Sequence, residues 1–325
     1  MKKEDLKIVF FGTPEFAVAS LDALVSGGYN VAAVVTMPDK AAGRGQHLSY
    51  SAVKKYALEK GLPLLQPVKL KDEAFVEELR SIAADLFIVI AFRMLPEVVW
   101  SMPPMGTFNL HGSLLPRYRG AAPLNRAVMN GDSVTGVTTF MLKKEIDTGD
   151  ILCQESIEVG PDENVGSVHD RLMEIGARLT TDTVDCLLAG TLSPIPQDEL
   201  LKGIEPTPAP KIFKEDCEID WTRTSPEIHN HVRGLSPYPA AWTTLKLGKD
   251  NIVTTVKILA TGRNSAHAIL GAGELLLEGK KAFAGCGHGD SIELIEVQPA
   301  GKRPMNAADY LRGLRLGECG APHFE

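Results

Sequence analysis

Residues 106–123, GTFNLHGSLLPRYRGAAP, carry the side chains best suited to catalysis. Thr107 to His111 alternates as in a β-strand, so Asn109 and His111 would share one face, about 7 Å apart along the backbone. An amide N–H and an imidazole can together bind the oxyanion of a tetrahedral intermediate and exchange a proton with a nitrogen. The alternative is that both polar side chains only cap the strand. The turn over residues 113–116 could offer backbone hydrogen bonds to a flat heterocycle.

A carboxylate that could serve the same centre lies in IDTGD, residues 146–150. Asp147 follows a predicted strand and could orient or charge His111. A structural Asp in a turn is the alternative. Asp-Thr-Gly is also the aspartic-protease tripeptide, but that chemistry needs two carboxylates sharing a proton, and this chain has one such tripeptide.

A glycine-containing cationic loop, TMPDKAAGRGQHL, covers residues 36–48 and contains Lys40, Arg44 and His47. It could clasp phosphates, or it could be a solvated connector. The loop leaves the C-terminal end of a predicted strand, which is the side where open α/β sheets bind ligands. That position favours a role in binding.

The elements that must position these groups alternate between strand and helix, as in a mostly parallel, Rossmann-like α/β sheet. We expect strands at 8–11, 31–36, 64–65, 86–91, 107–110 and 134–142, and helices at 15–26, 49–60, 72–81, 123–130 and 165–189. The turn after the first strand is Gly12-Thr13-Pro14, which lacks the G-x-G-x-x-G glycines of a dinucleotide site. A nicotinamide cofactor is therefore disfavoured.

The amino-acid composition changes after Gly190, because five prolines fall within residues 194–210. We expect a linker over 191–211, since proline interrupts regular structure. Beyond it, short β-rich runs at 242–247, 252–259, 274–277 and 291–297 indicate a small barrel or sandwich. The predicted domains are therefore residues 1–190 and 212–325.

Composition describes an ordinary globular chain: 325 residues, 44% hydrophobic and 23% charged. No apolar run is long enough for a membrane span, and no signal peptide is evident, so we expect a cytoplasmic protein. The five cysteines form no C-x-x-C pair, so no zinc site is indicated. The net charge of −7 lies entirely in residues 1–207, because residues 208–325 contain 14 basic and 14 acidic residues. A basic face on the second domain is compatible with that balance.

Several segments together resemble the methionyl-tRNA formyltransferase family of folate-dependent formyltransferases, over nearly the whole chain. They are FFGTPEFA, TMPDKAAGRGQHL, NLHGSLLPRYRGAAP, IDTGDIL, APKIFKEDCEIDW and VQPAGKRPMNAADYLRG. NLHGSLLP and IDTGDIL are shared by the folate-dependent enzymes, whereas RYRGAAP, AGRG and QPAGKRPM look specific to the tRNA enzymes. The resemblance implies formyl transfer from 10-formyltetrahydrofolate to initiator methionyl-tRNA, with no metal or nicotinamide.

The resemblance also implies a role for individual residues. The catalytic trio would be Asn109, His111 and Asp147. The folate contacts would be Phe92, Leu95, Pro96, Ser113, Leu114, Leu115 and Pro116. The tRNA contacts would be Lys40, Arg44, His47 and Lys211, and an OB-like C-terminal barrel would grip the tRNA. Residues 91–96 depart from the family's usual Tyr-Gly segment, which affects the pterin pocket, and residues 143–146 replace a run that usually contains glycine.

Two other functions remain open on sequence. One is another formyl-folate enzyme, either a sugar-nucleotide formyltransferase or a hydrolase that releases formate. The other is an RNA-binding protein whose formyltransferase-like domain is inactive, against which the intact trio counts. We expect a monomer with no membrane partner.

Overall fold

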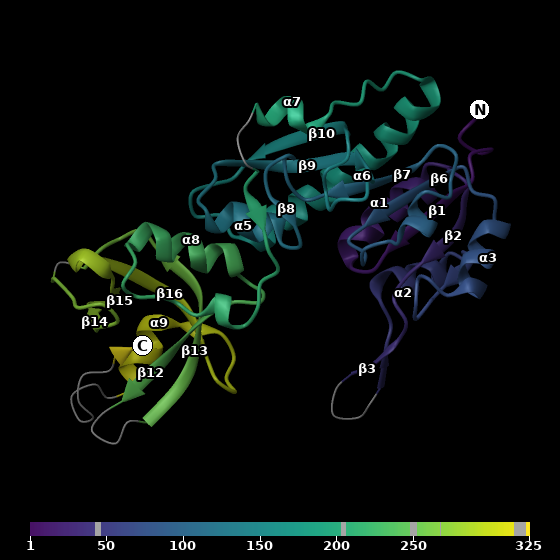
Figure 1. The fold of residues 1–325 in the computed structure, drawn as a ribbon. Coiled ribbons are helices and arrows are strands. Elements are labelled where there is room, and N and C mark those ends of the chain that lie inside the picture. Colours follow the sequence, from purple (N-terminus) through teal and green to yellow (C-terminus); the bar gives the residue numbers. More distant parts are fainter. Residues whose placement is uncertain (43–46, 203–205, 248–251, 267, 315–322) are drawn as a thin grey trace. The chain divides into compact units, whose positions relative to one another are not determined.

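The computed structural model describes the chain except for residues 43–46, 203–205, 248–251, 267 and 315–322 (Figure 1). The chain forms two compact units, and neither is continuous in sequence. The first unit is made of Met1–Gly120, Gly136–Ile157 and Asp170–Pro208, and the second of Ala121–Thr135, Glu158–His169 and Ala209–Glu325.

The first unit is built on a sheet with the strand order β10-β9-β7-β6-β1-β2-β5. Its strands are β1 (Ile8–Gly12), β2 (Val31–Val35), β5 (Leu64–Leu65), β6 (Leu86–Ile90), β7 (Thr107–His111), β9 (Val134–Met141) and β10 (Ile151–Glu158). The run from β5 to β7 is parallel, and β9 pairs with β7 in the antiparallel direction. The predicted Rossmann-like sheet is confirmed, although β10 was missed because its polar and apolar residues alternate weakly.

Helices cover both faces of this sheet. They are α1 (Glu15–Ser26), α2 (Ala52–Glu59), α3 (Glu73–Ser81), α4 (Glu97–Trp100), α6 (Val165–Ala189) and α7 (Gln197–Leu201). Phe11 and Val89 pack with residues of α3 in one core cluster. On the opposite face Leu110 meets α6 so closely that a Cβ on Gly176 would lie 2.7 Å from its side chain. Glycine at that position lets the helix approach the sheet.

The 36–48 segment differs from the predicted loop. Strands β3 (Lys40–Ala42) and β4 (His47–Ser49) pair in the antiparallel direction, Lys40 opposite Ser49. Consequently α2 begins at Ala52 and not at Ser49, with the Ser51 side chain as its N-cap. The periodicity of a helix had been extended over residues that belong to β4.

The 191–211 segment also contains more regular structure than its prolines predict. Helix α7 begins directly after Pro196, where the missing N–H of a preceding proline is tolerated. Strand β11 (Pro208–Ala209) pairs with β8 (Arg119–Gly120). Among the residues that the structure describes, no helix is long and apolar enough to cross a membrane.

The second unit is an antiparallel sheet in the order β14-β15-β16-β13-β12-β18, with β17 beside β16. Its elements are α5 (Pro123–Met129), a 3-10 turn (Glu215–Cys217), α8 (Ser225–Leu235), β12 (Ala241–Leu247), β13 (Ile252–Gly262), β14 (Leu275–Glu278), β15 (Lys281–Gly285), a second 3-10 turn (Gly287–Gly289), β16 (Ser291–Pro299), β17 (Met305–Asn306), α9 (Ala307–Gly313) and β18 (His323–Phe324). A bridge between Glu274 and His323, with Phe324 N donating to Gly273 O at 2.9 Å, joins the two ends of the strand order. The predicted small barrel is thus observed.

Candidate active site

Asn109 and His111 lie at the C-terminal end of β7. Parallel pairing sets Phe11, Val89 and Asn109 side by side in one row across β1, β6 and β7. Residues in such a row share a face of the sheet, so Asn109 and, two residues on, His111 face the α3 side, opposite Leu110 and α6. Asn109 is half-buried, and His111 is 7% exposed. The predicted alternation therefore places both side chains on one face.

The His111 ring is fixed by a hydrogen bond at one edge and faces a carboxylate at the other. Its Nε2 lies 2.9 Å from the backbone oxygen of Tyr118. Because a carbonyl oxygen only accepts, Nε2 carries the proton of this hydrogen bond. The Nδ1 atom faces Asp147, with 3.8 Å between Nδ1 and Oδ2, beyond hydrogen-bond length. Nδ1 is therefore the edge that can take up or release a proton, with a carboxylate beside it to stabilise the imidazolium.

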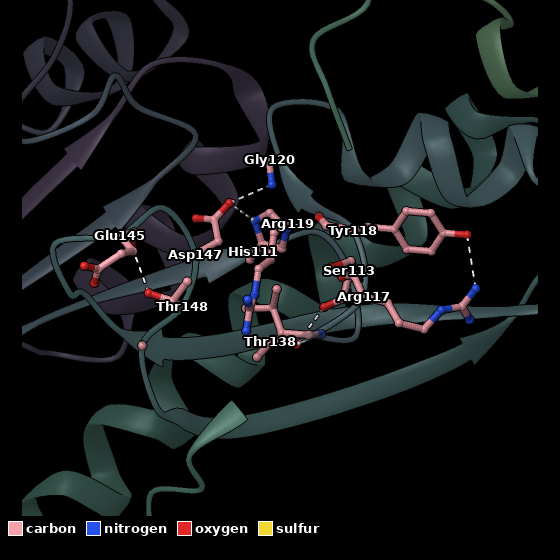
Figure 2. Close-up of polar contacts among 12 residues, drawn as sticks. His111, Ser113, Arg117, Tyr118, Arg119, Gly120, Thr138, Glu145, Asp147 and Thr148 are labelled. Atoms are coloured by element: carbon pink, nitrogen blue, oxygen red, sulfur yellow. Dashed lines mark hydrogen bonds and ion pairs between the residues drawn. The ribbon is translucent and has the colours of Figure 1, made fainter. Parts of the chain in front are cut away.

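The Asp147 carboxylate lies between Gly120 N and the His111 ring, as Figure 2 shows. Its Oδ2 accepts a hydrogen bond of 2.9 Å from Gly120 N. Its φ of +54° lies in the left-handed region, which Asp tolerates better than most residues. Two residues on, a Cβ at Gly149 would lie 1.5 Å from Met141 O, so the turn requires glycine there. His111 and Asp147, from distant stretches of sequence, are thus brought together.

Sequence reasoning missed the residues that support this turn. Gln197 in α7 is 2% exposed, and its Nε2 donates to Asp147 O at 2.9 Å and to Gly149 O at 2.7 Å. Arg119 in turn donates to Gln197 Oε1 from Nε at 3.0 Å and from a terminal nitrogen at 2.7 Å. Gln197 lies in the segment interpreted as a linker, so no local signal could have identified it.

The turn after β7 is held by hydrogen bonds and is partly buried. The Ser113 hydroxyl donates to Arg117 O at 2.7 Å, and Leu115 packs in a small core with Phe140 and Ile151. Thr138 Oγ1 donates to Ser113 O and accepts from Leu115 N, at 2.6 and 3.1 Å. The side chains of Ser113 and Leu115 are therefore committed to the protein, while the partly exposed Leu114 and Pro116 flank them.

The 92–96 segment borders a surface pocket of about 300 Å³, lined by residues 68–71 and 93–97. The pocket combines the apolar side chains of Leu70, Leu95 and Pro96 with the cations Lys69, Lys71 and Arg93. Phe92 is half-buried beside Phe11, with 5.8 Å between ring centroids. Within the described ranges, the Nε atom of Arg93 is buried without a hydrogen-bond partner. Burial lowers the pKa of this guanidinium.

The candidate tRNA contacts are only partly described. Lys40 and His47 lie on the paired strands β3 and β4, and Arg44 lies outside the described residues. Lys211, in the second unit, is exposed, with its Nζ 5.3 Å from the Phe213 ring centroid. The described part of the chain contains no group of three or more His, Cys, Asp or Glu that could hold a metal ion.

The chain matches two family models, "Formyl transferase" over residues 6–184 and "Formyl transferase, C-terminal domain" over residues 211–315. It is 52% identical to a protein named methionyl-tRNA formyltransferase from Bacteroides fragilis, over 98% of each chain. It is 55% identical to one of the same name from Parabacteroides distasonis, over 97% of this chain and 98% of the other.

Solved structures with this fold include the sugar 3N-formyl transferase WlaRD, with a TM-score of 0.64 at 19% identity, covering 92% of this chain and 99% of that one. HypX from Aquifex aeolicus gives a TM-score of 0.61 at 18% identity, over 96% of this chain and 48% of that one. At such identities the likeness concerns the fold alone. The two family models and the full-length relatives together show that the chain belongs to the methionyl-tRNA formyltransferase family of formyl transferases.

Proposed function

We propose that this protein transfers the formyl group of 10-formyltetrahydrofolate to the α-amino group of initiator methionyl-tRNA, giving N-formylmethionyl-tRNA for translation initiation. The observation that carries the proposal is the His111–Asp147 pair at the end of β7. The chain that contains this pair also matches relatives named for this activity over nearly its whole length. The reaction belongs in the cytoplasm, and the enzyme acts as a monomer.

The chain's own residues supply orientation and proton transfer. An α-amine has a reference pKa near ~7.7, so a useful fraction is nucleophilic at neutral pH without a strong base. The amine attacks the formyl carbon while the Asn109 amide stabilises the oxygen that gains charge, and His111 contributes once it has become an imidazolium. His111 accepts the amine proton at Nδ1, beside Asp147, and passes it to folate N10 as the carbon–nitrogen bond to folate breaks. No covalent enzyme intermediate is needed.

The folate would supply the activated formyl group, and the residues near Phe92 fit such a ligand. The ring portion of a folate is flat and mostly apolar, and its tail ends in carboxylates. The pocket beside Leu95 and Pro96 offers apolar side chains together with Lys69, Lys71 and Arg93. The guanidinium of Arg93, whose terminal nitrogens donate to Pro67 O and Val68 O, brings a positive charge to the pocket that would attract an anionic group. The 113–116 turn would contribute mainly its backbone and the side chains of Leu114 and Pro116.

The tRNA would be held by both predicted domains. We assign formyl transfer to residues 1–190, the connection to 191–211, and an OB-like tRNA-binding role to 212–325. The loop over residues 38–48, with Lys40, Arg44 and His47, would meet the acceptor arm, and Lys211 would contact its phosphates. Arg44→Ala should therefore raise the Michaelis constant for tRNA, more at low salt than at high salt, while folate binding stays unchanged.

The deciding experiment incubates the purified protein with 10-formyltetrahydrofolate and charged initiator tRNA, with charged elongator methionine tRNA as the control. We expect formylmethionine on the initiator tRNA and far less on the elongator. A parallel reaction without tRNA measures released formate. Formate release without formylmethionine would show a hydrolase and refute the proposal, and no turnover of labelled formyl-folate would indicate an RNA-binding protein.

A further inference from the structure

A mostly buried ion pair lies at the base of the β3–β4 hairpin. Lys54 Nζ in α2 is 2.6 Å from Oδ2 of Asp39, the residue directly before β3, and the two side chains are 11% and 22% exposed. Lysine is rarely buried unless it has a charged partner. The pair is therefore part of the packed interior of the first unit. It does not belong to the exposed ion pairs that contribute little to stability.

Further hydrogen bonds tie both legs of the hairpin to the body of the first unit. Gln66, just after β5, donates from Nε2 to Asp39 Oδ1 at 3.0 Å and to Met37 O at 2.9 Å. The hydroxyls of Thr36 and Ser51 lie 2.9 Å apart, which links the outgoing leg to the returning one. Ser51 also accepts from Lys54 N at 3.0 Å as the N-cap of α2.

The charges at this base hold one another in place. Hydrogen bonds from Lys54 and Gln66 lower the pKa of the Asp39 carboxyl, which stays ionised near neutrality. The Lys54 ammonium also lies 4.1 Å from the ring centroid of Tyr50, on the returning leg. A cation between a carboxylate and an aromatic face is attracted to both. Lys54 thus joins the residue before β3 to the residue after β4.

Strands β3 and β4 form a two-stranded sheet of their own, separate from the seven-stranded sheet. A two-stranded hairpin is marginally stable by itself in water. In Figure 1, β3 runs away from α2 and the sheet. Within the described part of the chain, β3 and β4 mainly contact each other. The direction of the hairpin is therefore set at its base, by the residues that fix Asp39.

We propose that Asp39, Lys54 and Gln66 are positioning residues that aim the β3–β4 hairpin at the acceptor arm of the tRNA. The inference rests on the proposed function, because the 36–48 segment contains Lys40, Arg44 and His47. None of the three touches the reacting atoms. They act through the direction of the hairpin, and a displacement of about 1 Å at a substrate-positioning element can cost on the order of 10²-fold in rate.

The test compares Asp39→Ala, Lys54→Met and Gln66→Leu with the wild type, and uses Lys55→Met, an exposed neighbour in α2, as the matched control. We expect kcat/KM for initiator methionyl-tRNA to fall about tenfold or more in the three variants, and less than about twofold in the control. Affinity for 5-formyltetrahydrofolate should stay at the wild-type value. Lys54→Arg should restore most of the activity, because it keeps the charge near Asp39.

Two further measurements separate positioning from general damage. Backbone hydrogen exchange at residues 37–42 and 47–49 should be several-fold faster in Asp39→Ala, while exchange in β1 and β6 stays slow. The double variant Asp39→Ala/Lys54→Met should lose no more activity than the worse single variant. Each single substitution already breaks the interaction between Asp39 and Lys54, so the two effects should not add.

Each alternative result has a separate meaning. Unchanged exchange in the hairpin overturns the positioning role, whatever the activity. Faster exchange with wild-type kcat/KM overturns it as well, because the hairpin then needs no fixed direction. A wild-type protein that leaves the tRNA unformylated refutes the proposed function, and hydrogen exchange still decides whether Asp39, Lys54 and Gln66 hold the hairpin.

Discussion

Two buried histidines in this protein each face an aspartate, one in each unit. His111 Nδ1 lies 3.8 Å from Asp147 Oδ2, and His229 Nε2 lies 3.4 Å from Asp162 Oδ1. The aspartates differ, because the Asp147 side chain is 17% exposed and the Asp162 side chain 58%. A carboxylate in water is screened, whereas one that is mostly buried interacts strongly with a neighbouring charge.

The hydrogen bonds of His229 show a structural role. Its Nδ1 lies 2.9 Å from Thr261 Oγ1, and its Nε2 lies 3.1 Å from Pro161 O. Burial lowers the pKa of this imidazole, so it stays neutral and holds the 158–169 segment against α8. His111 instead ends a strand, and its Nδ1 lies too far from Asp147 for a hydrogen bond. Residue types alone do not distinguish the two pairs, but their positions do.

The largest expected effect separates the two histidines by activity. His111→Ala and Asn109→Ala should each lower turnover on the order of 10²–10³-fold, the usual cost of removing one group that stabilises a developing oxyanion. His229→Gln should leave turnover within a few-fold of wild type in the same single-turnover assay with methionyl-tRNA. Near wild-type formylation by His111→Ala would show that the catalytic assignment is wrong.

The support of the Asp147 turn gives the next largest effect. Gln197→Leu leaves the Asp147 and Gly149 carbonyls and the Arg119 side chain without their observed partner, which should cost about 1–3 kcal/mol in the free energy of unfolding. Turnover should fall about tenfold, because Asp147 loses its fixed direction. Urea unfolding and kinetics measure both, with the exposed Glu199→Ala in α7 as the control. Equal losses in the control would assign the effect to the helix and not to the hydrogen bonds.

Sequence alone could predict the parts of the site that lie on one strand or in one motif. Alternation along β7 placed Asn109 and His111 on one face, and the glycine-containing turn suggested Asp147. The role of Gln197 could not be predicted from sequence, because its contact with Asp147 depends on tertiary packing. The pairing of β3 with β4 was missed because the glycines and polar residues of the 36–48 sequence are typical of loops.

A smaller effect concerns pH and the second unit. Burial lowers the pKa of both His229 and His231 below the ordinary value. Between the lowered folded pKa and the unfolded value near ~6.5, the unfolded chain binds more protons, so stability falls as pH drops below that value. The free energy of unfolding should change by up to about 1.4 kcal/mol per pH unit for each histidine. Urea unfolding midpoints measured from pH 7.5 to pH 5 report this change.

The control for this prediction is His288→Asn, at an exposed turn of the same unit. His229→Gln should flatten the decline toward low pH, because one of the two buried rings no longer takes up a proton on unfolding. His288→Asn should leave the decline as it is in the wild type. A wild-type midpoint that is constant over this range would contradict the proposed neutral state of the buried rings.

The smallest effect tests whether His229 needs its aspartate at all. Asp162 also receives two hydrogen bonds from Arg263, at 2.9 and 3.1 Å, but both side chains are more than half exposed. Exposed ion pairs contribute about 0–1 kcal/mol, and less at high salt, so Asp162→Asn should change the free energy of unfolding by no more than that. Turnover should not change. A loss of several kcal/mol would mean that His229 is charged in the folded protein and would remove the contrast with His111.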